Sequence, residues 1–239
     1  MTAFLTFVRY KKRYIYFALT AMAIHRIPLI LNPKIKFHKA LGCGQGDTFS
    51  QQADWQQYGL LAIVEKADGE KASHLPIQQL RKKIYGSFIT AWWKFFGCEL
   101  CTLVLQPIEG HGSWDGKKAF GELPLKTDYE GQIAVLTRAT IRGSKRKRFW
   151  EHVEGASNDM RKADGYIFSI GVGETPFLKQ ATFSVWESKA KMKAFAYSMP
   201  HHVDVIQKTR KEDWYKEDMF VRFKIEREEG TIRGRQPLQ

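Results

Sequence analysis

The order of segments in the C-terminal half constrains the fold more than any other feature of this sequence. Period-two and helical hydrophobic patterns there predict four strands and two helical regions. The expected strands are residues 133–141, 166–172, 182–186 and 219–225, and the expected helices are residues 148–163, 189–197 and a further helix after Pro200. The resulting order is βαββαβ, which is that of a ferredoxin-like unit.

The N-terminal half follows the same order less sharply. A strand is expected at residues 3–8, a helix at 13–26, strands near Phe37 and Leu60, a helix from Pro76 and a strand at 101–105. Two such units can pair their sheets into one barrel. We therefore predict an α+β chain of tandem ferredoxin-like units that forms a single-chain dimeric-α/β-barrel. It would be one domain over residues 1–239, with similar halves at about 1–110 and 130–228 and a polar tail at 229–239.

An apolar run near the N-terminus imitates a signal peptide or a short membrane span. Lys11, Lys12 and Arg13 precede this run, residues 14–24. His25 and Arg26 end it well short of the roughly 20 residues that a bilayer requires, and no small-residue cleavage pattern follows. We therefore expect a strand followed by a buried helix, in a cytoplasmic protein.

The three cysteines cannot all pair with one another, and a four-cysteine zinc site is impossible. Cys98 and Cys101 have the spacing of a redox pair or of half a metal site. Reduced cytosolic thiols are the simpler interpretation, and a redox role for the pair stays open.

The chain carries a formal charge of +13, from 38 Lys and Arg against 25 Asp and Glu, and would attract phosphates, nucleic acid, anionic lipid or an acidic protein. The basic run at residues 144–148 is either such a patch or the solvated start of a helix. Association with a membrane surface therefore stays open. The sequence contains no G-x-G-x-x-G in a βαβ unit, no P-loop, no G-x-S-x-G and no H-E-x-x-H, which disfavours dinucleotide-binding, kinase and hydrolase classes.

Helical spacing predicts different environments for the two adjacent histidines after Pro200. His202 shares a stripe with Val205 and Thr209, which is expected to face the core, whereas His201 shares its face with Asp204 and is expected to face solvent. A histidine on an apolar stripe is either a hydrogen-bonded core residue or a metal ligand. The spacing alone leaves both interpretations open.

Two further constellations carry polar side chains. The run Gly110-His111-Gly112-Ser113-Trp114-Asp115-Gly116 combines glycines, which permit tight turns, with several polar groups and an indole. It is either a loop that lines a site or an ordinary turn with a surface histidine. The strand at residues 133–141 places Arg138 on one face, in line with Arg142 beyond its end, where the two could bind carboxylates or be solvated at an edge.

Several blocks together resemble the spheroidene monooxygenase family of carotenoid-producing bacteria. The blocks are Leu41-Gly-Cys-Gly-Gln-Gly-Asp-Thr-Phe49, Gly112-Ser-Trp-Asp-Gly116, Ile133-Ala-Val-Leu-Thr-Arg-Ala-Thr-Ile141 with Phe149-Trp150, Ser169-Ile-Gly-Val-Gly-Glu174, Ala181-Thr-Phe-Ser-Val-Trp186, Ala194-Phe-Ala-Tyr197, His202, Thr209-Arg210, Trp214 and Met219-Phe-Val-Arg-Phe223. The likeness runs through most of the chain. Residues 66–105 match poorly.

The resemblance implies a monooxygenase that introduces a hydroxyl or keto group at the C2 end of an acyclic carotenoid, using haem b, O2 and a ferredoxin-type electron donor. It favours the interpretation of His202 as a metal ligand, with Tyr197 as a supporting neighbour. Arg138 and Arg142 become candidates for the haem propionates. The expected proton-delivering group near bound oxygen, listed together, is His111, Ser113, Trp114 and Asp115. Nucleic acid is not an expected partner.

Two alternatives remain. One is a different reaction on the same architecture, such as a haem-dependent dehydratase or a cofactor-free monooxygenase. The other is a basic, non-catalytic module that binds nucleic acid or anionic membrane, whose affinity would fall steeply with salt. A bound iron porphyrin would exclude both the cofactor-free enzyme and the binding module.

Overall fold

The structure, a computed structural model, describes residues 1–46, 52–175 and 177–238, without the side chains of residues 153, 154, 156 and 200–202. In these residues the strands are β1 (Thr2–Arg9), β2 (Ile35–Gly44), β3 (Ala53–Val64), β4 (Glu99–Gly112), β5 (Ile133–Ile141), β6 (Tyr166–Thr175), β7 (Lys179–Trp186) and β8 (Tyr215–Gly230). The α-helices are α1 (Ile15–Ile24), α2 (Arg26–Leu31), α3 (Lys66–Ser73), α4 (Ile77–Phe95), α5 (Arg146–Lys162), α6 (Lys189–Ser198) and α7 (Pro200–Glu212). Short 3₁₀ turns at Lys12–Tyr14 and Gly143–Lys145 precede α1 and α5.

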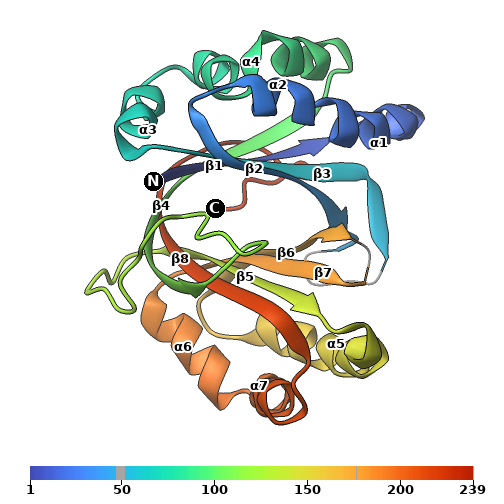
Figure 1. Ribbon diagram of the computed structural model, residues 1–239, viewed down its shortest axis with the longest axis vertical. Coiled ribbons are helices and arrows are strands. Elements are labelled where there is room, and N and C mark those ends of the chain that lie inside the picture. The colour runs from blue at the N-terminus through green and yellow to red at the C-terminus, as the bar shows by residue number, and fades with distance from the viewer. Residues whose placement is uncertain (47–51, 176, 239) are drawn as a thin grey trace.

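The strands close into an antiparallel barrel in the order β1-β3-β2-β6-β7-β5-β8-β4. Each half of the chain supplies one four-stranded sheet, and the two sheets meet along a long β4–β8 seam and a short β2–β6 seam. Helices α1–α4 cover the outer face of the first sheet and α5–α7 that of the second (Figure 1). The predicted tandem ferredoxin-like barrel is confirmed, and β5 has the bounds expected from the sequence.

Side chains fill the interior of the barrel. The inward-facing residues of both sheets form one apolar cluster, which includes Leu5, Leu61, Leu136 and Phe183. A cavity of about 10 Å³ lies among them. Because this space is at the lower limit of the roughly 10–15 Å³ that a single water molecule requires, the barrel is a packed core. A long substrate cannot thread through it.

The outer faces of the two sheets are packed differently. Large side chains such as Phe4, Tyr58 and Leu60 cover the first sheet and join α4 in one continuous cluster. On the second sheet the apolar contacts are split into two clusters. One surrounds Trp186 and Phe195, and the other contains Phe149, Trp150 and Trp214.

The N-terminal helical segment corrects one expectation. Residues Lys12–Leu31 are helical almost throughout and are apolar and long enough to cross a membrane by length and composition, yet only 22% of the most apolar window is buried. The predicted buried helix is therefore wrong, because Ala18 and Ala21 face the sheet while larger side chains such as Tyr16 face solvent. His25 does not interrupt the helix, since its backbone keeps helical angles.

The C-terminal residues fold back onto the barrel. β8 continues to Gly230, and a turn follows in which Ile232 pairs with Arg235. Ile232 is buried in the barrel core. Arg233 forms an ion pair with Asp54 of β3 at 3.1 Å. The stretch expected as a polar tail thus covers one end of the barrel.

Candidate active site

The loop after β4 turns into one mouth of the barrel at Gly112. The φ of Gly112 is +86°, and any side chain there would collide with the carbonyl group of Asp218 in β8. Only glycine suits this position. The turn carries Trp114 into the barrel core, where its indole is fully buried and packs on Phe37 with ring centroids 5.4 Å apart.

Two carboxylates organise this loop. Glu217 of β8 accepts the Ser113 hydroxyl at 2.7 Å and two backbone N–H groups of the loop, including that of Asp115, at 2.7 and 3.2 Å. Glu174 of β6 accepts the indole N–H of Trp114 at 2.7 Å. The three predicted loop residues are thereby fixed in one arrangement across the barrel mouth.

Arg138 joins the loop to both carboxylates. Its side chain is 1% exposed and lies on the inner face of β5, where it pairs with Glu217, with Asp115 at 3.1 Å and with Glu174 at 3.4 Å. The guanidinium also lies 5.6 Å from the centre of the Trp114 ring. The sequence analysis placed Arg138 and the loop in separate constellations, and the structure brings them together.

Two lysines complete the charge balance of this cluster. Lys39 of β2 contacts both Asp115 and Glu174 at 2.5 Å, and Lys179 contacts Asp115 at 2.7 Å. Although burial opposes it, hydrogen bonds from Lys179 and Lys39 lower the pKa of Asp115 to about 2. Asp115 is therefore ionised near neutral pH and holds no proton to donate.

Glu217 is ionised for a related reason. Burial alone would raise its pKa, but hydrogen bonds from the Gly116 backbone, from Ser113 and from Arg138 lower that pKa to about 2. The cluster thus pairs three carboxylates with three cations. The terminal nitrogens of Arg138 and both lysine ammonium groups already contact these carboxylates, so the cluster holds the loop in place, while the buried Nε atom of Arg138 has no hydrogen-bond partner among the described residues.

His111 lies apart from this cluster. It pairs with Phe220 across the β4–β8 seam, and the two rings stack with centroids 5.9 Å apart. Both face the outside of the barrel, since the neighbouring pair, Gly112 and Met219, lies on the inner side. The predicted group of four is therefore divided between the barrel mouth and the outer face.

The outer face beside Phe220 is lined by small residues. Pairing of β6, β7, β5 and β8 aligns Gly171, Thr182, Thr137 and Phe220 in one row. A second row contains Ser169, Ser184, Val135 and Arg222. Thr137 is exposed although its strand is paired on both sides. Ser169 and Ser184 are buried by contrast, so the helices leave this part of the sheet uncovered at Thr137, between the two apolar clusters.

Helix α7 spans these two clusters. Met199, at its N-cap, packs against the cluster around Trp186, and Val205 packs against the cluster around Trp214. Position 202 falls between them at a spacing of three residues. The side chains of His202 and His201 lie outside the described residues, so the predicted difference in their directions stays a prediction.

The other two predicted cofactor residues lie at the surface. Tyr197 lies on α6 and is 73% exposed. From this position it does not support a buried ligand. Arg142 follows β5, is 43% exposed and pairs with Asp213 at 3.0 Å. Arg138 and Arg142 therefore do not form one carboxylate-binding face. The Arg138 side chain points into the barrel mouth, whereas Arg142 lies at the surface beyond the end of β5.

The cysteines form no pair. Cys43, Cys98 and Cys101 are free thiols. Burial raises the pKa of Cys98 to about 12, and burial also raises that of Cys101 above its ordinary value. Both are protonated near neutral pH and are poor nucleophiles. Among the described residues, no group of three or more His, Cys, Asp or Glu side chains could hold a metal ion.

Five residues of the site were not predicted from the sequence. Glu217, Lys39 and Lys179 had no local signal, because each joins the cluster across a strand pairing between distant segments. Glu174 closes one of the blocks that carry the family resemblance, which was a usable signal. Arg222 on the outer face was likewise part of a matched block.

The chain has three close relatives in sequence, and no family model matches it. The spheroidene monooxygenase of Rhodobacter capsulatus is 31% identical over 224 residues, which cover 92% of this chain and 88% of that protein. The spheroidene monooxygenase of Rubrivivax gelatinosus is 34% identical over 87% of this chain and 75% of its own length. That of Cereibacter sphaeroides is 34% identical over 91% of this chain, which spans only 64% of that relative's length.

Solved structures share the fold at low sequence identity. A crystal structure of aldoxime dehydratase superposes with a TM-score of 0.60 at 11% identity, covering 94% of this chain and 80% of the other. A second aldoxime dehydratase structure, in complex with butyraldoxime, gives a TM-score of 0.59. At this identity the likeness supports the barrel architecture alone.

Proposed function

Because this chain belongs to the spheroidene monooxygenase family, we propose that it is a haem-dependent oxygenase of an acyclic carotenoid. In the proposed reaction a C–H bond at the C2 end of the substrate becomes C–OH with one atom of O2. Two electrons and two protons convert the other oxygen atom to water. A second oxidation of the same carbon, followed by loss of water, gives the ketone.

The observation that carries this proposal is the small-residue patch on the second sheet, defined as Thr137, Ser169, Gly171, Thr182 and Ser184. A flat macrocycle needs a floor without large side chains and apolar walls at its edges. Thr137 is the exposed part of this patch and Thr182 is half-buried, whereas Ser169, Gly171 and Ser184 are buried. The open floor therefore lies at Thr137, and the two apolar clusters that flank it would supply the walls. The equivalent face of the first sheet carries large side chains. These observations support placing the group over Thr137.

In this proposal His202 would hold the haem iron, since α7 bridges the two walls. The chemistry that haem would supply here is the binding and activation of O2. Arg142, at the end of β5, is the proposed propionate partner. Arg138 is a positioning residue for the loop at the barrel mouth, because its guanidinium is already held by carboxylates.

Proton delivery falls to His111 in this proposal. Ser113 and Trp114 donate to internal carboxylates, and Asp115 is ionised. His111 is exposed and stacks on Phe220, in the row that contains Thr137. His111 is thus an exposed imidazole at the edge of the row that leads to Thr137, with Phe220 between them. The role of the other three predicted residues is to hold this corner of β4 and β8.

The substrate is proposed to lie outside the barrel. The interior offers only about 10 Å³. A second pocket, of about 220 Å³, lies at the barrel mouth between β4, β8 and residues 118–125. It is below the roughly 300–1,000 Å³ typical of ligand pockets. In this proposal a long apolar chain therefore runs along the outer surface toward the patch.

The proposed electron donor is a ferredoxin-type protein with an acidic docking face. The start of α5 exposes Arg146, Lys147 and Arg148, and of these Arg148 is paired with Glu212 at 3.3 Å. The remaining cations are on α5, which lies in the helical layer over the second sheet (Figure 1), the sheet that holds the patch. Their position suits docking of an acidic partner near the cofactor.

The first test is an absorption spectrum of protein expressed with a haem precursor. Wild type and His201→Ala should show a Soret band, and His202→Ala should lose it. Carotenoid turnover with O2 and a reduced donor follows as the second assay. A wild type that binds no haem would overturn the proposed cofactor.

A steric test addresses the patch directly. Thr137→Trp fills the proposed floor and should abolish the Soret band, whereas Thr137→Val keeps the volume and should retain it. Thermal unfolding of the apoprotein checks that both variants fold. Equal haem binding by the two variants would show that the cofactor does not lie on the patch.

A further inference from the structure

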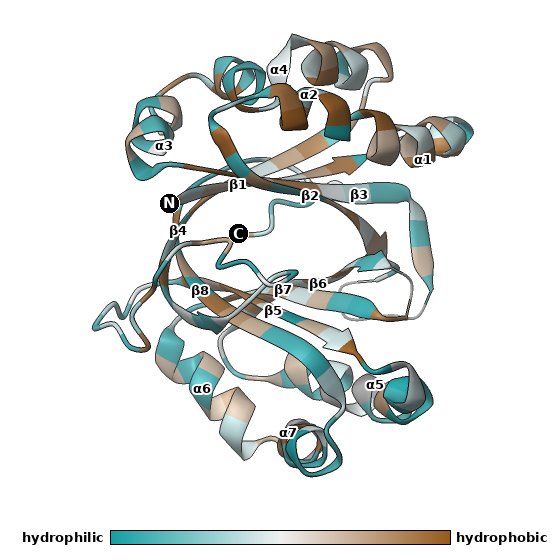
Figure 2. Cartoon of the chain, in the orientation of Figure 1, coloured by the Kyte–Doolittle hydropathy of each residue, from teal (hydrophilic) through white to brown (hydrophobic). Residues whose placement is uncertain are grey.

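One face of the N-terminal helical layer turns large apolar side chains toward solvent. Along α1 and α2, Tyr16 is 82% exposed, Leu19 42%, Ile27 58% and Ile30 67%. Their spacing follows one helical stripe, on the side opposite the buried stripe that includes Ala21. Figure 2 shows this segment as a strongly hydrophobic part of the molecule's surface layer. A helix that is apolar on all sides is normally buried or in contact with lipid.

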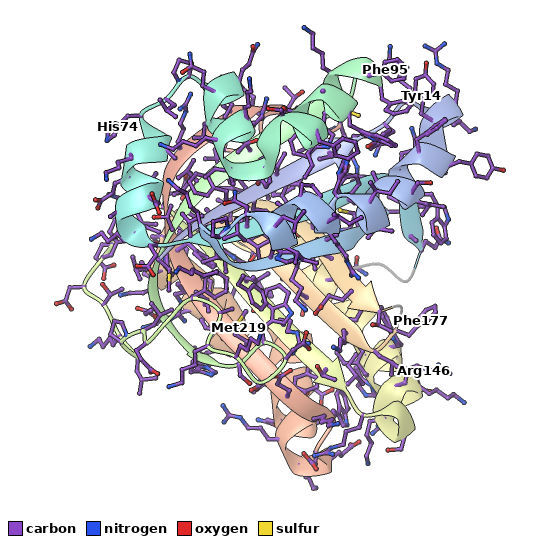
Figure 3. All side chains as sticks on the ribbon, turned by 45° about the horizontal axis from the view of Figure 1, so that its top comes forward. Tyr14, His74, Phe95, Arg146, Phe177 and Met219 are labelled. Carbon is purple, nitrogen blue, oxygen red and sulfur yellow. The ribbon has the colours of Figure 1, made fainter. Side chains whose placement is uncertain are left out.

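Aromatic rings of α4 continue this surface. Phe95 is 82% exposed and Phe88 50% exposed. Phe17 of α1 packs on Phe96 with ring centroids 4.6 Å apart and so joins the two helices. Tyr14 and Phe95 lie near each other at one end of the helical layer (Figure 3). Aromatic side chains favour the boundary between headgroups and acyl chains of a bilayer.

The charge on this surface has one sign. Residues 1–46 contain no Asp or Glu, and neither does α4. Lys11, Lys12 and Arg13 are exposed at the start of the segment, Arg26 lies midway, and Lys94 lies beside Phe95. Cations at the edge of an apolar face are the pattern of a helix that lies in a membrane interface.

We propose that α1, α2 and the C-terminal half of α4 form a docking surface that inserts into the interface of an anionic bilayer. Charge selects this occupant over a second copy of the chain, because two such surfaces face to face would oppose cation to cation. Charge also selects anionic over neutral lipid, since each Lys or Arg near such a surface raises affinity about fivefold. This inference rests on the proposed function. An acyclic carotenoid dissolves in lipid, so an enzyme that oxidises it would meet its substrate at a bilayer.

The test is sedimentation of the full chain with vesicles of phosphatidylcholine alone or with added phosphatidylglycerol. Wild type should bind the anionic vesicles, and affinity should fall as salt rises. Ile27→Glu/Ile30→Glu should lower that affinity at least about tenfold. The matched control is Leu125→Glu, since Leu125 is 79% exposed in a loop elsewhere and should leave vesicle binding unchanged. Thermal unfolding confirms that each variant folds.

The charge contribution is tested by replacing Lys11, Lys12 and Arg13 with Gln. This variant should lose preference for anionic vesicles while keeping the fold. Wild type that ignores anionic vesicles, or a double glutamate variant that binds as wild type does, overturns the proposal. So does a wild-type dimer in light scattering that the double variant converts to monomer without any vesicle binding. The vesicles contain no carotenoid, so failure here leaves the proposed oxygenase reaction standing.

Discussion

His25 makes the stability of this protein depend on pH in a calculable way. It is fully buried at the end of α1, ringed by Tyr58, Phe88, Trp92 and Trp93. The Tyr58 hydroxyl lies 3.0 Å from its Nδ1 atom, and among the described residues no hydrogen-bond partner meets its Nε2 atom. Burial lowers the pKa of His25 from 6.5 to about 4.

The sign follows from proton binding. Between pH 6.5 and 4 the unfolded chain binds a proton at this imidazole and the folded chain does not, so stability rises with pH in that window. The lowered pKa of His25 contributes at most about 3 kcal/mol to the free energy of unfolding, and about 2 kcal/mol of this contribution should be lost as the pH falls from 7.5 to 5. Above pH 7 the contribution is complete.

Urea unfolding of the apoprotein at pH 7.5, 6 and 5 measures this loss. His25→Phe removes the titrating group, so its free energy of unfolding should change with pH by about 2 kcal/mol less than that of wild type. Tyr58→Phe is the matched control, because it destabilises the same cluster but leaves the imidazole to titrate. If wild type and His25→Phe show the same pH dependence, the burial argument for His25 is refuted.

Three further predictions concern other parts of the chain. Arg138→Leu should lower the free energy of unfolding by about 3–5 kcal/mol, since it removes the buried cation that pairs with Glu217, whereas Arg142→Leu at the surface should cost about 1 kcal/mol or less; equal losses in urea unfolding would contradict this. Cys98 should react slowly with iodoacetamide at pH 7.5, as measured by mass spectrometry, because burial raises its pKa to about 12; rapid labelling of the folded protein would show an accessible thiolate. Arg146→Glu/Lys147→Glu should slow donor-dependent turnover about tenfold at low salt, and a defect that persists unchanged at high salt would not be electrostatic.

Local pattern was sufficient for most elements of the fold. β5 was predicted at residues 133–141 because that run is rich in apolar and β-branched residues, and α5, α6 and α7 follow clear helical spacing. α3 was missed, since its sequence is polar and carries a glycine within the helix. The burial of α1 was predicted wrongly because a run of apolar residues indicates a helix but not what covers each side of it.

The candidate site was predictable only in part. The composition of the glycine-rich run predicted a loop there, and Gly112 has the positive φ that such a run permits. The division of that loop between two faces depends on the β4–β8 register, which places His111 outward and Gly112 inward. A shift of one residue would exchange the two. No property of the loop's own sequence sets that register.

The sequence by itself determined the βαββαβ order, its duplication and the family resemblance, because these depend on spacing along the chain. Only the tertiary structure decided which charges meet. Arg138, Asp115 and Glu217 are far apart in sequence and become neighbours because barrel closure brings β4, β5 and β8 together. Tertiary packing likewise decided that Thr137 stays uncovered, since exposure depends on where the helices come to lie.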